Sequence, residues 1–511
     1  MGKTIKLGID FGTSYCFCGT QRGNDVVPLI ASTERYGVPS IFYYDRGQKL
    51  TGRQAERAAG RRPEYAVRSV KRKLEEAAFT LGGEKQKFTP AQVVEEIIAG
   101  IVRDAETQLE QSYLEEYDEL EAVITVPIDF SEPRKQLIRA AAGRVRLKNG
   151  KNLRVTGVLP EPIAAAIHYF GVTREKDANI VVFDLGGGTL DVALVRANAG
   201  NAGVPYEVVD QEGNPKLGGD DWDAKLAEYL EGICIRELGG KLTVNDKGKL
   251  LQEARNIKED LTTLTKFKGD IELRGDFIPV EISRQQFEQM TSSLLGRASE
   301  LVRKLAARIK GHKIDHIILT GGSSNMPQVK AELERLRKNG TFSGTPDILV
   351  VEPEHAIAYG AARYAQTLTW TQIGSKAVKE MITLRATHSY GICYTDRSNK
   401  DYVTFLIKKN DPLPASEVTT SFTRYENQKE SFFAVYESDY TGTEKDVYDS
   451  KLWGKRIMAI TLKRTESNIP VGRKSKETLT LTKEGVLTCK AVDLVSGVEM
   501  EDHVTIERTI S

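Results

Sequence analysis

The chain has 511 residues, which is too long for one compact core and predicts two or three domains. Lysine and arginine (72) balance aspartate and glutamate (71), so the net charge of +1 gives no electrostatic reason to expect nucleic acid or an anionic membrane as a partner. Five cysteines without a C-x-x-C pair, and the absence of an apolar signal segment or membrane-length apolar run, predict a cytoplasmic protein with free thiols.

The first candidate anion-binding site follows a short apolar strand, residues 5–10, that ends in the carboxylate of Asp10. The turn that follows it contains Gly12, Thr13, Ser14 and Tyr15. Glycine lets backbone N–H groups come close to an anion because no Cβ is in the way. Neither a P-loop pattern nor a G-x-G-x-x-G fingerprint occurs in the chain, so the two commonest nucleotide-binding motifs are excluded.

Lys71 lies in a basic run at 68–76. Such a run is typical of a solvated helix face, although a lysine there could also reach a transferring phosphoryl group, and position alone leaves both readings open. Residues 88–117 predict a long amphipathic helix, with Thr89 as N-cap and Pro90 in the first position. Its expected buried stripe consists of Val94, Ile97, Ile98, Ile101, Val102 and Ala105.

A buried strand is expected at 120–127 and a helix beginning near Ser131. Residues 159–171 predict a turn followed by an alanine-rich helix, with Glu161 at the mouth of the turn. A carboxylate at a helix start is as often a simple cap on the helix dipole as a functional group.

The central feature is the stretch 179–192, in which a short β-branched strand ends in Asp184. Gly186, Gly187 and Gly188 follow, and then Thr189 and Asp191. Alone, this pattern fits a glycine-rich hairpin turn as well as a phosphate loop. The strand that ends in Asp10 has the same pattern of an aspartate followed by a glycine-containing turn, so we expect two duplicated lobes. Their turns would hold a polyphosphate from both sides, with a hydrated Mg²⁺ between the carboxylates and the phosphates.

Further glycine-rich turns follow. Gly218 and Gly219 lead into a helix, and a polar helix at 249–265 carries Arg255, Lys258 and Thr262 on one face. A third strand ends in Gly321, Gly322 and Ser323 without a carboxylate, which suits an uncharged base or ribose.

Two helices complete this region. Ser283 and Gln286 predict a capping box that opens one long helix. Gly360, among small residues of a helix within 352–362, predicts close packing of that helix on a strand. The long helix is expected to bury Phe287, Met290, Leu294, Leu301, Val302, Leu305 and Ile309.

The composition changes after this region. Residues 367–379 are polar and predict a linker, and from 387 onward short alternating segments predict an antiparallel β-sandwich. Lys483-Glu484-Gly485 predicts a hairpin turn. The expected strands are 403–407, 418–422, 432–436, 458–462, 478–482, 486–491 and 504–506.

Several stretches recur in a familiar order: GIDFGTS (8–14), AVITVP (122–127), EPIAAAI (161–167), FDLGGGTLDV (183–192), LGGDDWD (217–223), LTGGSSNMP (319–327) and AIAYGAA (356–362). This set closely resembles the heat-shock chaperones of the DnaK type, the Hsp70 family, within the actin-like ATPase superfamily. Residues 479–506 also resemble the peptide-binding sandwich of that family. The resemblance implies an α/β two-lobed actin-like (ribonuclease H-like) ATPase domain at 1–366, a linker at 367–386 and an all-β sandwich at 387–511.

The resemblance also implies roles for the residues above. Asp10 and Asp184 would hold a hydrated Mg²⁺, Lys71 would lie beside the γ-phosphate and the attacking water, and Glu161 and Asp191 would orient that water and the metal shell. ATP or ADP phosphates would bind to the two turns, and the nucleoside to the third turn and the polar helix. The implied nucleotide-binding set is Gly12, Thr13, Ser14, Tyr15, Gly186, Gly187, Gly188, Thr189, Gly218, Gly219, Arg255, Lys258, Thr262, Gly321, Gly322 and Ser323.

The chain also departs from the family pattern. The interdomain linker is interrupted by Thr383 and ends basic at Arg385. At the expected contact with a J-domain protein, Pro160 and Ile163 flank the Glu-Pro pair, where the family often has asparagine and threonine. Glu259 and Asn325 stand where many eukaryotic members have arginine, and no helical lid is expected after the sandwich.

We therefore expect a lidless DnaK-like ATPase whose partners are unfolded or extended polypeptides, a J-domain protein and a nucleotide exchange factor, and neither nucleic acid nor membrane. An actin-like ATPase that acts as a nucleotide-gated assembly module for one dedicated partner is the alternative. A sugar kinase is a distant third.

Overall fold

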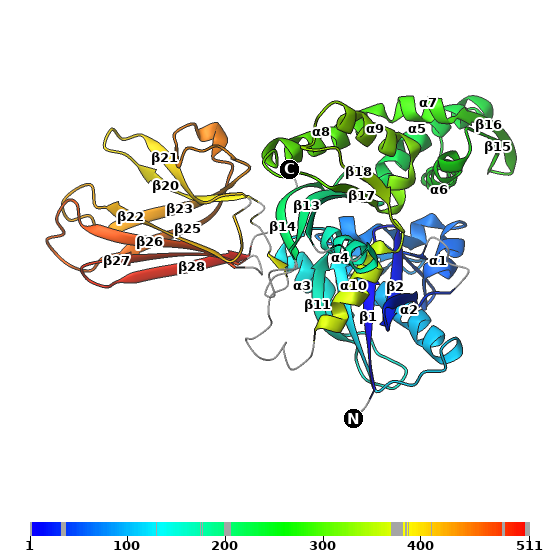
Figure 1. The fold of residues 1–511 in the computed structure, drawn as a ribbon, viewed down its shortest axis with the longest axis horizontal. Helices are drawn as coiled ribbons and strands as arrows, with labels where there is room; N and C mark the ends of the chain where they lie inside the picture. Colours follow the sequence, from blue (N-terminus) through cyan, green and yellow to red (C-terminus); the bar gives the residue numbers. More distant parts are fainter. Residues whose placement is uncertain are drawn as a thin grey trace. The chain divides into compact units, whose positions relative to one another are not determined.

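The structure is a computed structural model. It describes residues 3–31, 37–128, 130–173, 175, 177–198, 206–368, 382, 383, 386, 388–409, 411–482 and 486–505. The chain divides into two compact units (Figure 1). The first holds the described residues up to 368, apart from 130–134 and 207–209, which are grouped with the second unit. The expected linker lies almost entirely outside the described residues, as does the expected turn at 483–485, so the domain boundaries stay a prediction.

Two sheets of the first unit share one strand arrangement. In each, the first strand pairs antiparallel with the second and parallel with a strand that comes later in the chain. The first sheet runs β11 (Arg154–Pro160), β10 (Glu119–Val126), β1 (Thr4–Asp10), β2 (Tyr15–Arg22) and β3 (Asp25–Pro28), with β4 (Val38–Pro39) also paired to β2. The second runs β18 (Asp347–Val350), β17 (His316–Thr320), β12 (Asp177–Leu185), β13 (Leu190–Asn198) and β14 (Tyr206–Asn214).

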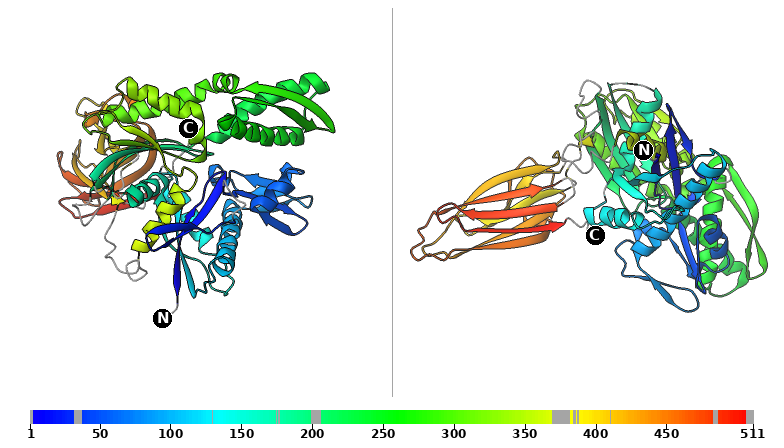
Figure 2. Two further views of the ribbon diagram at one scale, coloured as in Figure 1. Left: turned by 45° about the vertical axis from the view of Figure 1, so that its right-hand side comes forward. Right: turned by 90° about the horizontal axis from the view of Figure 1, so that it is seen from below.

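Helices α4 (Glu161–Thr173) and α10 (Ala356–Thr367) pack against each other and on these two sheets (Figures 1 and 2). A Cβ at Gly360 would lie 1.7 Å from the carbonyl oxygen of Ala164, so glycine allows the two helices to touch. The expected close packing of this helix on a strand is present, but Gly360 itself contacts α4. The close contact with a strand is made by Gly8 of β1, where a Cβ would lie 2.1 Å from the backbone nitrogen of Ala362.

The remaining helices of the first unit are α1 (Gly52–Ala59), α2 (Pro90–Gln111), α3 (Glu132–Ala142), α5 (Gly219–Leu238), α6 (Val244–Thr263), α7 (Arg284–Met290), α8 (Ser292–Arg308) and α9 (Pro327–Lys338). Short 3₁₀ turns lie at Pro63–Tyr65, Val70–Arg72 and Gly322–Asn325. Three small sheet groups add β5 (Ile41–Asp45), β6 (Gln48–Thr51) and β7 (Ala66–Arg68); β8 (Phe79–Leu81) and β9 (Gln86–Phe88); and β15 (Lys266–Leu273) and β16 (Asp276–Ser283). No helix in the described ranges is long and apolar enough to cross a membrane.

The capping signals fix helix starts better than helix ends. Thr89 and Gln92 form the reciprocal capping box of α2, but this helix ends at Gln111 rather than at 117. The capping box of Ser283 and Gln286 is also present, yet the expected long helix is two helices, α7 and α8. They are interrupted at Thr291, whose hydroxyl donates to the carbonyl oxygen of Phe287 (2.8 Å).

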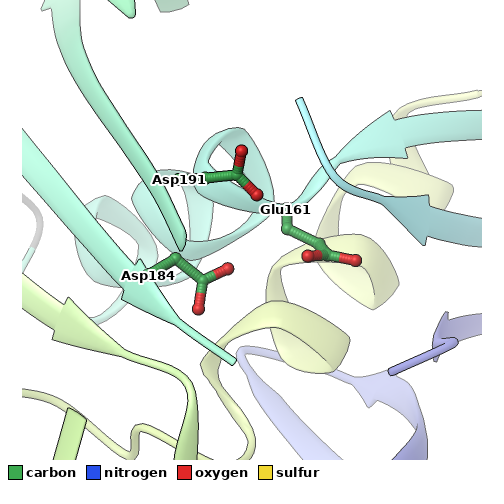
Figure 3. A group of neighbouring side chains, drawn as sticks. All are labelled: Glu161, Asp184 and Asp191. Carbon is green, nitrogen blue, oxygen red and sulfur yellow. The ribbon is translucent and has the colours of Figure 1, made fainter. Parts of the chain in front are cut away.

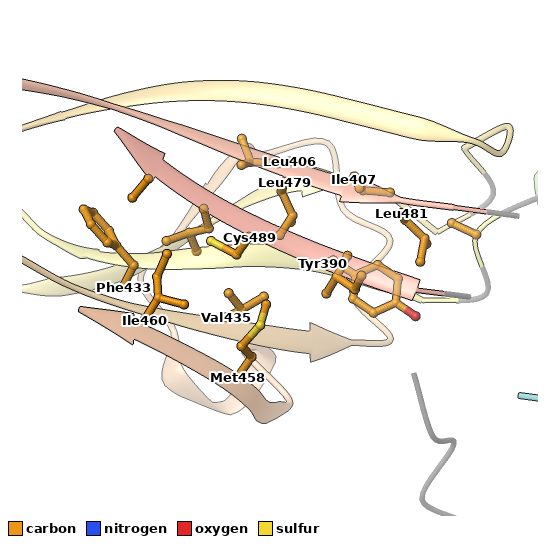
Figure 4. Packing of buried hydrophobic residues seen from close by; sticks show 14 of the residues in the cluster. Tyr390, Leu406, Ile407, Phe433, Val435, Met458, Ile460, Leu479, Leu481 and Cys489 are labelled. Carbon is orange, nitrogen blue, oxygen red and sulfur yellow. The ribbon is translucent and has the colours of Figure 1, made fainter. Parts of the chain in front are cut away.

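The second unit is an antiparallel β-structure, as expected from the alternating segments. One sheet runs β24 (Asp446–Val447), β21 (Asp401–Ile407), β20 (Ser389–Thr395), β23 (Glu430–Ser438) and β25 (Lys455–Lys463). The other runs β22 (Ala415–Phe422), β26 (Lys474–Leu481), β27 (Val486–Asp493) and β28 (Glu499–Thr505). Apolar side chains from both sheets, among them Val435, Leu479 and Cys489, form one core (Figure 4). Every expected strand is present, and β20 and β24 are additional. A short strand, β19 (Ile382–Thr383), and a 3₁₀ turn at Ser450–Leu452 complete the elements.

Candidate nucleotide site

The two glycine-containing turns expected from the sequence lie against each other. The first joins β1 to β2 and the second joins β12 to β13, so each is the turn of an antiparallel hairpin. A Cβ at Gly187 would lie 2.0 Å from Oγ of Ser14, and a Cβ at Gly188 would lie 2.6 Å from Cγ2 of Thr13. The stretch 179–192 is therefore a hairpin turn that faces the first turn, and its role as a phosphate loop stays a prediction.

Glycines at the start of α5 pack behind the second turn. The backbone N–H of Gly219 donates to the carbonyl oxygen of Gly186 (2.9 Å), and that of Asp220 donates to the carbonyl oxygen of Gly187 (2.7 Å). A Cβ at Gly218 would lie 2.5 Å from the carbonyl carbon of Gly188. These contacts hold the second turn in place and leave the backbone of the turn open on its other side.

Three carboxylates meet beneath the turns (Figure 3). Glu161 is the first residue of α4, Asp184 lies on β12 and Asp191 lies on β13 directly opposite Asp184. One carboxylate oxygen from each lies within 4.8 Å of the other two, and all three side chains are buried. Such a group of oxygens can hold a divalent cation, directly or through water.

A buried ion pair adjoins this carboxylate cluster. Nζ of Lys71 lies 2.6 Å from Oε1 of Glu161. Burial alone would lower the pKa of Lys71, but the charges of Glu161 and Asp10 raise it, so this lysine is held as an ammonium. The sequence left the role of Lys71 open; the structure excludes the solvated face and puts this residue at the site.

The remaining aspartates are strongly affected by their surroundings. Burial and the charge of Glu161 raise the pKa of Asp10 to about 7, although Lys71 and a hydrogen bond from Thr125 (2.8 Å) oppose the shift. Burial, Glu161 and Asp10 raise the pKa of Asp184. The negative charge of these carboxylates favours protonation of Asp10 and Asp184. A bound cation would neutralise the same charge.

A cavity of about 390 Å³ extends from this cluster along the two turns. Its size is typical of a small-molecule site. Most of the expected site residues line it: Asp10, Gly12, Thr13, Ser14, Tyr15, Lys71, Glu161, Asp184, Gly186, Gly187, Thr189, Arg255, Lys258, Thr262, Gly321, Gly322 and Ser323. Gly188, Asp191, Gly218 and Gly219 lie outside the lining. The three glycines permit close packing, and Asp191 belongs to the carboxylate cluster.

Arg255 and Lys258 reach the cavity from α6 as part of an ion-pair network. Arg255 contacts Asp220 (2.9 Å) and Asp223 (3.2 Å), and Lys258 contacts Asp223 (2.6 Å). Asp220 also accepts from Ser14 (3.2 Å). The network ties α6 to the start of α5 and to the first turn, so these cations are fixed in position before any ligand binds.

The cavity is also lined by residues that sequence reasoning did not assign. They are Phe17, Thr263, Met326, Pro353, Glu354 and Ile357. Asn325, noted only as a departure from the family pattern, donates to Glu354 (2.9 Å) here. Three of them, Pro353, Glu354 and Ile357, lie in the segment 352–362, which sequence reasoning interpreted only in terms of helix packing.

A family model described as Hsp70 protein matches residues 75–511. The chain belongs to the Hsp70 family. Members of the Hsp70 family bind ATP, hydrolyse it and act as chaperones, so membership supports nucleotide binding, ATPase activity and a chaperone function in this chain. The match begins after Asp10, the first turn and Lys71, whose assignment depends on the geometry described above.

The residues of the site fit Mg²⁺ and a nucleotide, the groups that the Hsp70 family implies. Oδ1 of Asp184 is buried and accepts no hydrogen bond from any described residue, as expected for an atom that faces a cation. Side chains at Gly187 and Gly188 would fill the space between the two turns, so the glycines preserve a cradle of backbone N–H groups.

Proposed function

We propose that this Hsp70-family protein binds ATP with Mg²⁺ in the cavity of its first unit, hydrolyses it, and binds extended polypeptide segments through its second unit as a DnaK-like chaperone. The observation that carries the proposal is the meeting of two glycine turns over a buried lysine and a cluster of buried carboxylates. The repeated strand order of the two sheets supports a two-lobed actin-like, ribonuclease H-like ATPase fold.

In this proposal, Asp10 and Asp184 hold a hydrated Mg²⁺, which supplies charge neutralisation to the phosphates. Backbone N–H groups of Gly186–Gly188 and the hydroxyls of Thr13, Ser14 and Thr189 bind the phosphates. Gly321, Gly322, Ser323 and the α6 side chains Arg255, Lys258 and Thr262 hold the nucleoside.

Lys71 and the neighbouring carboxylates organise the water. The ammonium of Lys71, kept charged by Glu161, donates hydrogen bonds toward the γ-phosphate and orients the attacking water. Glu161 and Asp191 accept from that water and from the metal shell. Hydrolysis of this kind depends on alignment and charge neutralisation more than on a strong base.

The replacement Lys71→Ala tests the first part of the proposal. We expect ATP turnover to fall by about a hundredfold or more, because a charge that acts on the transition state is lost, while the Kd of a fluorescent ATP analogue changes much less. Lys73→Ala, whose residue is outside the cavity lining, is the matched control and keeps normal turnover. Normal turnover in the Lys71 variant would exclude the assigned role.

A peptide array probed with and without ATP tests the second part. Binding of many unrelated extended segments on the array supports a chaperone. A pull-down that retains one protein in stoichiometric amount supports a dedicated partner instead. The J-domain protein, the nucleotide exchange factor and the cytoplasmic location remain predictions.

A further inference from the structure

The edges of the two sheets in the second unit are not equally protected. Exposed strand edges pair with other chains unless they are short or carry charges. The edge strand β24 is protected because it spans only two residues, and the edge strands β25 and β28 are protected because they carry charges. β25 carries Lys455, Arg456 and Lys463, and β28 carries Glu499, Glu501 and Asp502. β22, the fourth edge, is eight residues long and has a single ionisable side chain, Glu417.

The backbone of β22 offers hydrogen-bonding groups on its open side. Just beyond the strand, the N–H of Thr423 donates to Arg473 (3.0 Å), and its carbonyl oxygen accepts from Gly472 (2.9 Å), so Thr423 faces β26. Because successive residues of a strand point their N–H and C=O groups to opposite sides, those of Val418, Thr420 and Phe422 face away from β26. The side chains of Val418 (48%) and Phe422 (54%) are half exposed.

Positive charge lies beside this edge. Lys476 and Lys474 of β26 pair with Thr420 and Phe422 of β22, and alternation along the strands puts all four side chains on the outer face of the sheet. Nζ of Lys474 lies 5.9 Å from the ring centroid of Phe422. Within the described part of the chain, neither lysine forms an ion pair. An incoming strand therefore meets apolar side chains at two positions and unpaired positive charge between and beside them.

We propose that β22 is a docking edge for an extended segment of a partner protein, which adds to the sheet as a further strand. The outward side chains of that segment are apolar opposite Val418 and Phe422 and acidic opposite Thr420, where they approach Lys476 and Lys474. This docking edge goes beyond the proposed function, because it adds to the second unit an interaction surface for a partner segment of stated chemistry.

The probe is a fluorescein-labelled peptide, Thr-Val-Thr-Glu-Thr-Val-Thr, measured by fluorescence anisotropy with the full chain. Thr420→Pro removes an N–H from the open side, a change that edge strands tolerate, and Val418→Lys introduces a protective charge. We expect either change to weaken binding by about tenfold. Met500→Lys, on the opposite edge strand β28, is the matched control and leaves the affinity unchanged.

Charge and backbone tests sharpen the proposal. Lys474→Glu with Lys476→Glu should reverse the preference between this probe and one with lysine in place of glutamate. Two further probes carry N-methyl groups on the odd-numbered or on the even-numbered peptide nitrogens. Only one of the two should fail to bind, because only one edge of an added strand is hydrogen-bonded to β22.

Each outcome decides a different question. If both N-methyl sets abolish binding, the segment lies in an enclosed groove; the second unit then binds polypeptides but the β22 edge is not the site. If array peptides bind but the affinity of the probe is the same for every β22 variant and the parent, the inference also fails and the proposed function stands. If no extended peptide binds the chain at all, both fail. A dimer that Thr420→Pro dissociates would identify a second copy, rather than a partner, as the occupant.

Discussion

Two helical glycines of the first unit have opposite surroundings, and their replacement should have opposite effects. A Cβ at Gly360 of α10 would lie 1.7 Å from the carbonyl oxygen of Ala164, whereas a Cβ at Gly296 of α8 would meet nothing within 4 Å. We expect Gly360→Ala to lower the free energy of unfolding by about 2–3 kcal/mol, because α4 and α10 must move apart. Gly296→Ala should instead stabilise by about 0.5–1 kcal/mol.

Chemical denaturation of the two variants measures this contrast. If Gly360→Ala is as stable as the parent, the packing of α10 on α4 is not as tight as the structure shows.

At the scale of single residues, the sequence was informative where a residue type has few uses. Asp10, Asp184 and the glycines between Gly186 and Gly188 could be assigned because a carboxylate next to glycines suits a cation and a phosphate. The family resemblance implied a role for Lys71, but residue type and position alone could not assign one, because a lysine in a basic run has the same sequence pattern whether it is solvated or buried. Only the long-range contact with Glu161 separates the two cases.

At the scale of elements, β26 contains an unusual buried acid that should make the second unit sensitive to pH. Glu477 accepts hydrogen bonds from Ser421 of β22 (2.8 Å) and Tyr394 of β20 (3.5 Å). Burial raises the pKa of Glu477 from 4.5 to about 7 despite these bonds and the charge of Arg464. The folded state therefore binds this proton more tightly than the unfolded state does.

The sign of the effect follows from this pKa. The stabilisation is fully present below about pH 4.5 and is lost as the pH rises through about 7, because the folded state must then bury an ionised carboxylate. Glu477→Gln, which cannot ionise, should remove this dependence and stabilise the unit at pH 8 by up to about 3 kcal/mol.

Amide hydrogen exchange of β26 and β27 in the full chain, compared between variant and parent at pH 5 and pH 8, measures the difference. Glu417→Gln, which removes the charge of an exposed carboxylate in β22, is the control and should change the protection at neither pH. Equal protection of the Glu477 variant and the parent at both pH values would contradict the prediction.

Element by element, the strands of the second unit and the helix starts with capping boxes could be predicted well, because apolar alternation and capping residues are local signals. The end of α2 at Gln111 and the break at Thr291 could not, because neither glycine nor proline marks either point and a threonine that bonds to the carbonyl four residues earlier also occurs inside helices. β24 was missed because two residues carry no pattern. The acids and arginines inside the sandwich, such as Asp493 and Arg464, were also invisible to a search for apolar alternation.

At the scale of the whole molecule, the proposed nucleotide and peptide activities belong to two separate compact units. We expect calorimetry of the full chain to show two transitions, of which Mg²⁺-ATP raises only the one from the first unit. At a hundredfold excess over Kd, the ligand should add about 2.7 kcal/mol to the stability of that unit.

Hydrogen exchange assigns the transitions, through the amides of β12 and β17 for the first unit and of β23 and β25 for the second. A nucleotide-dependent shift of both transitions would show that the units are thermodynamically coupled. The linker, which departs from the family pattern at Thr383 and Arg385, would then transmit the nucleotide state in spite of that departure.

The contact between the two glycine turns has a kinetic consequence. Ser14 and Thr13 touch Gly187 and Gly188 from the opposite sheet, so a nucleotide held by both turns is enclosed by two halves of the unit. If the two halves close around it, such a ligand leaves only as fast as the halves separate. Its residence time then reports an opening motion rather than the strength of its own contacts, and a partner that pries the halves apart would control the cycle without touching the nucleotide.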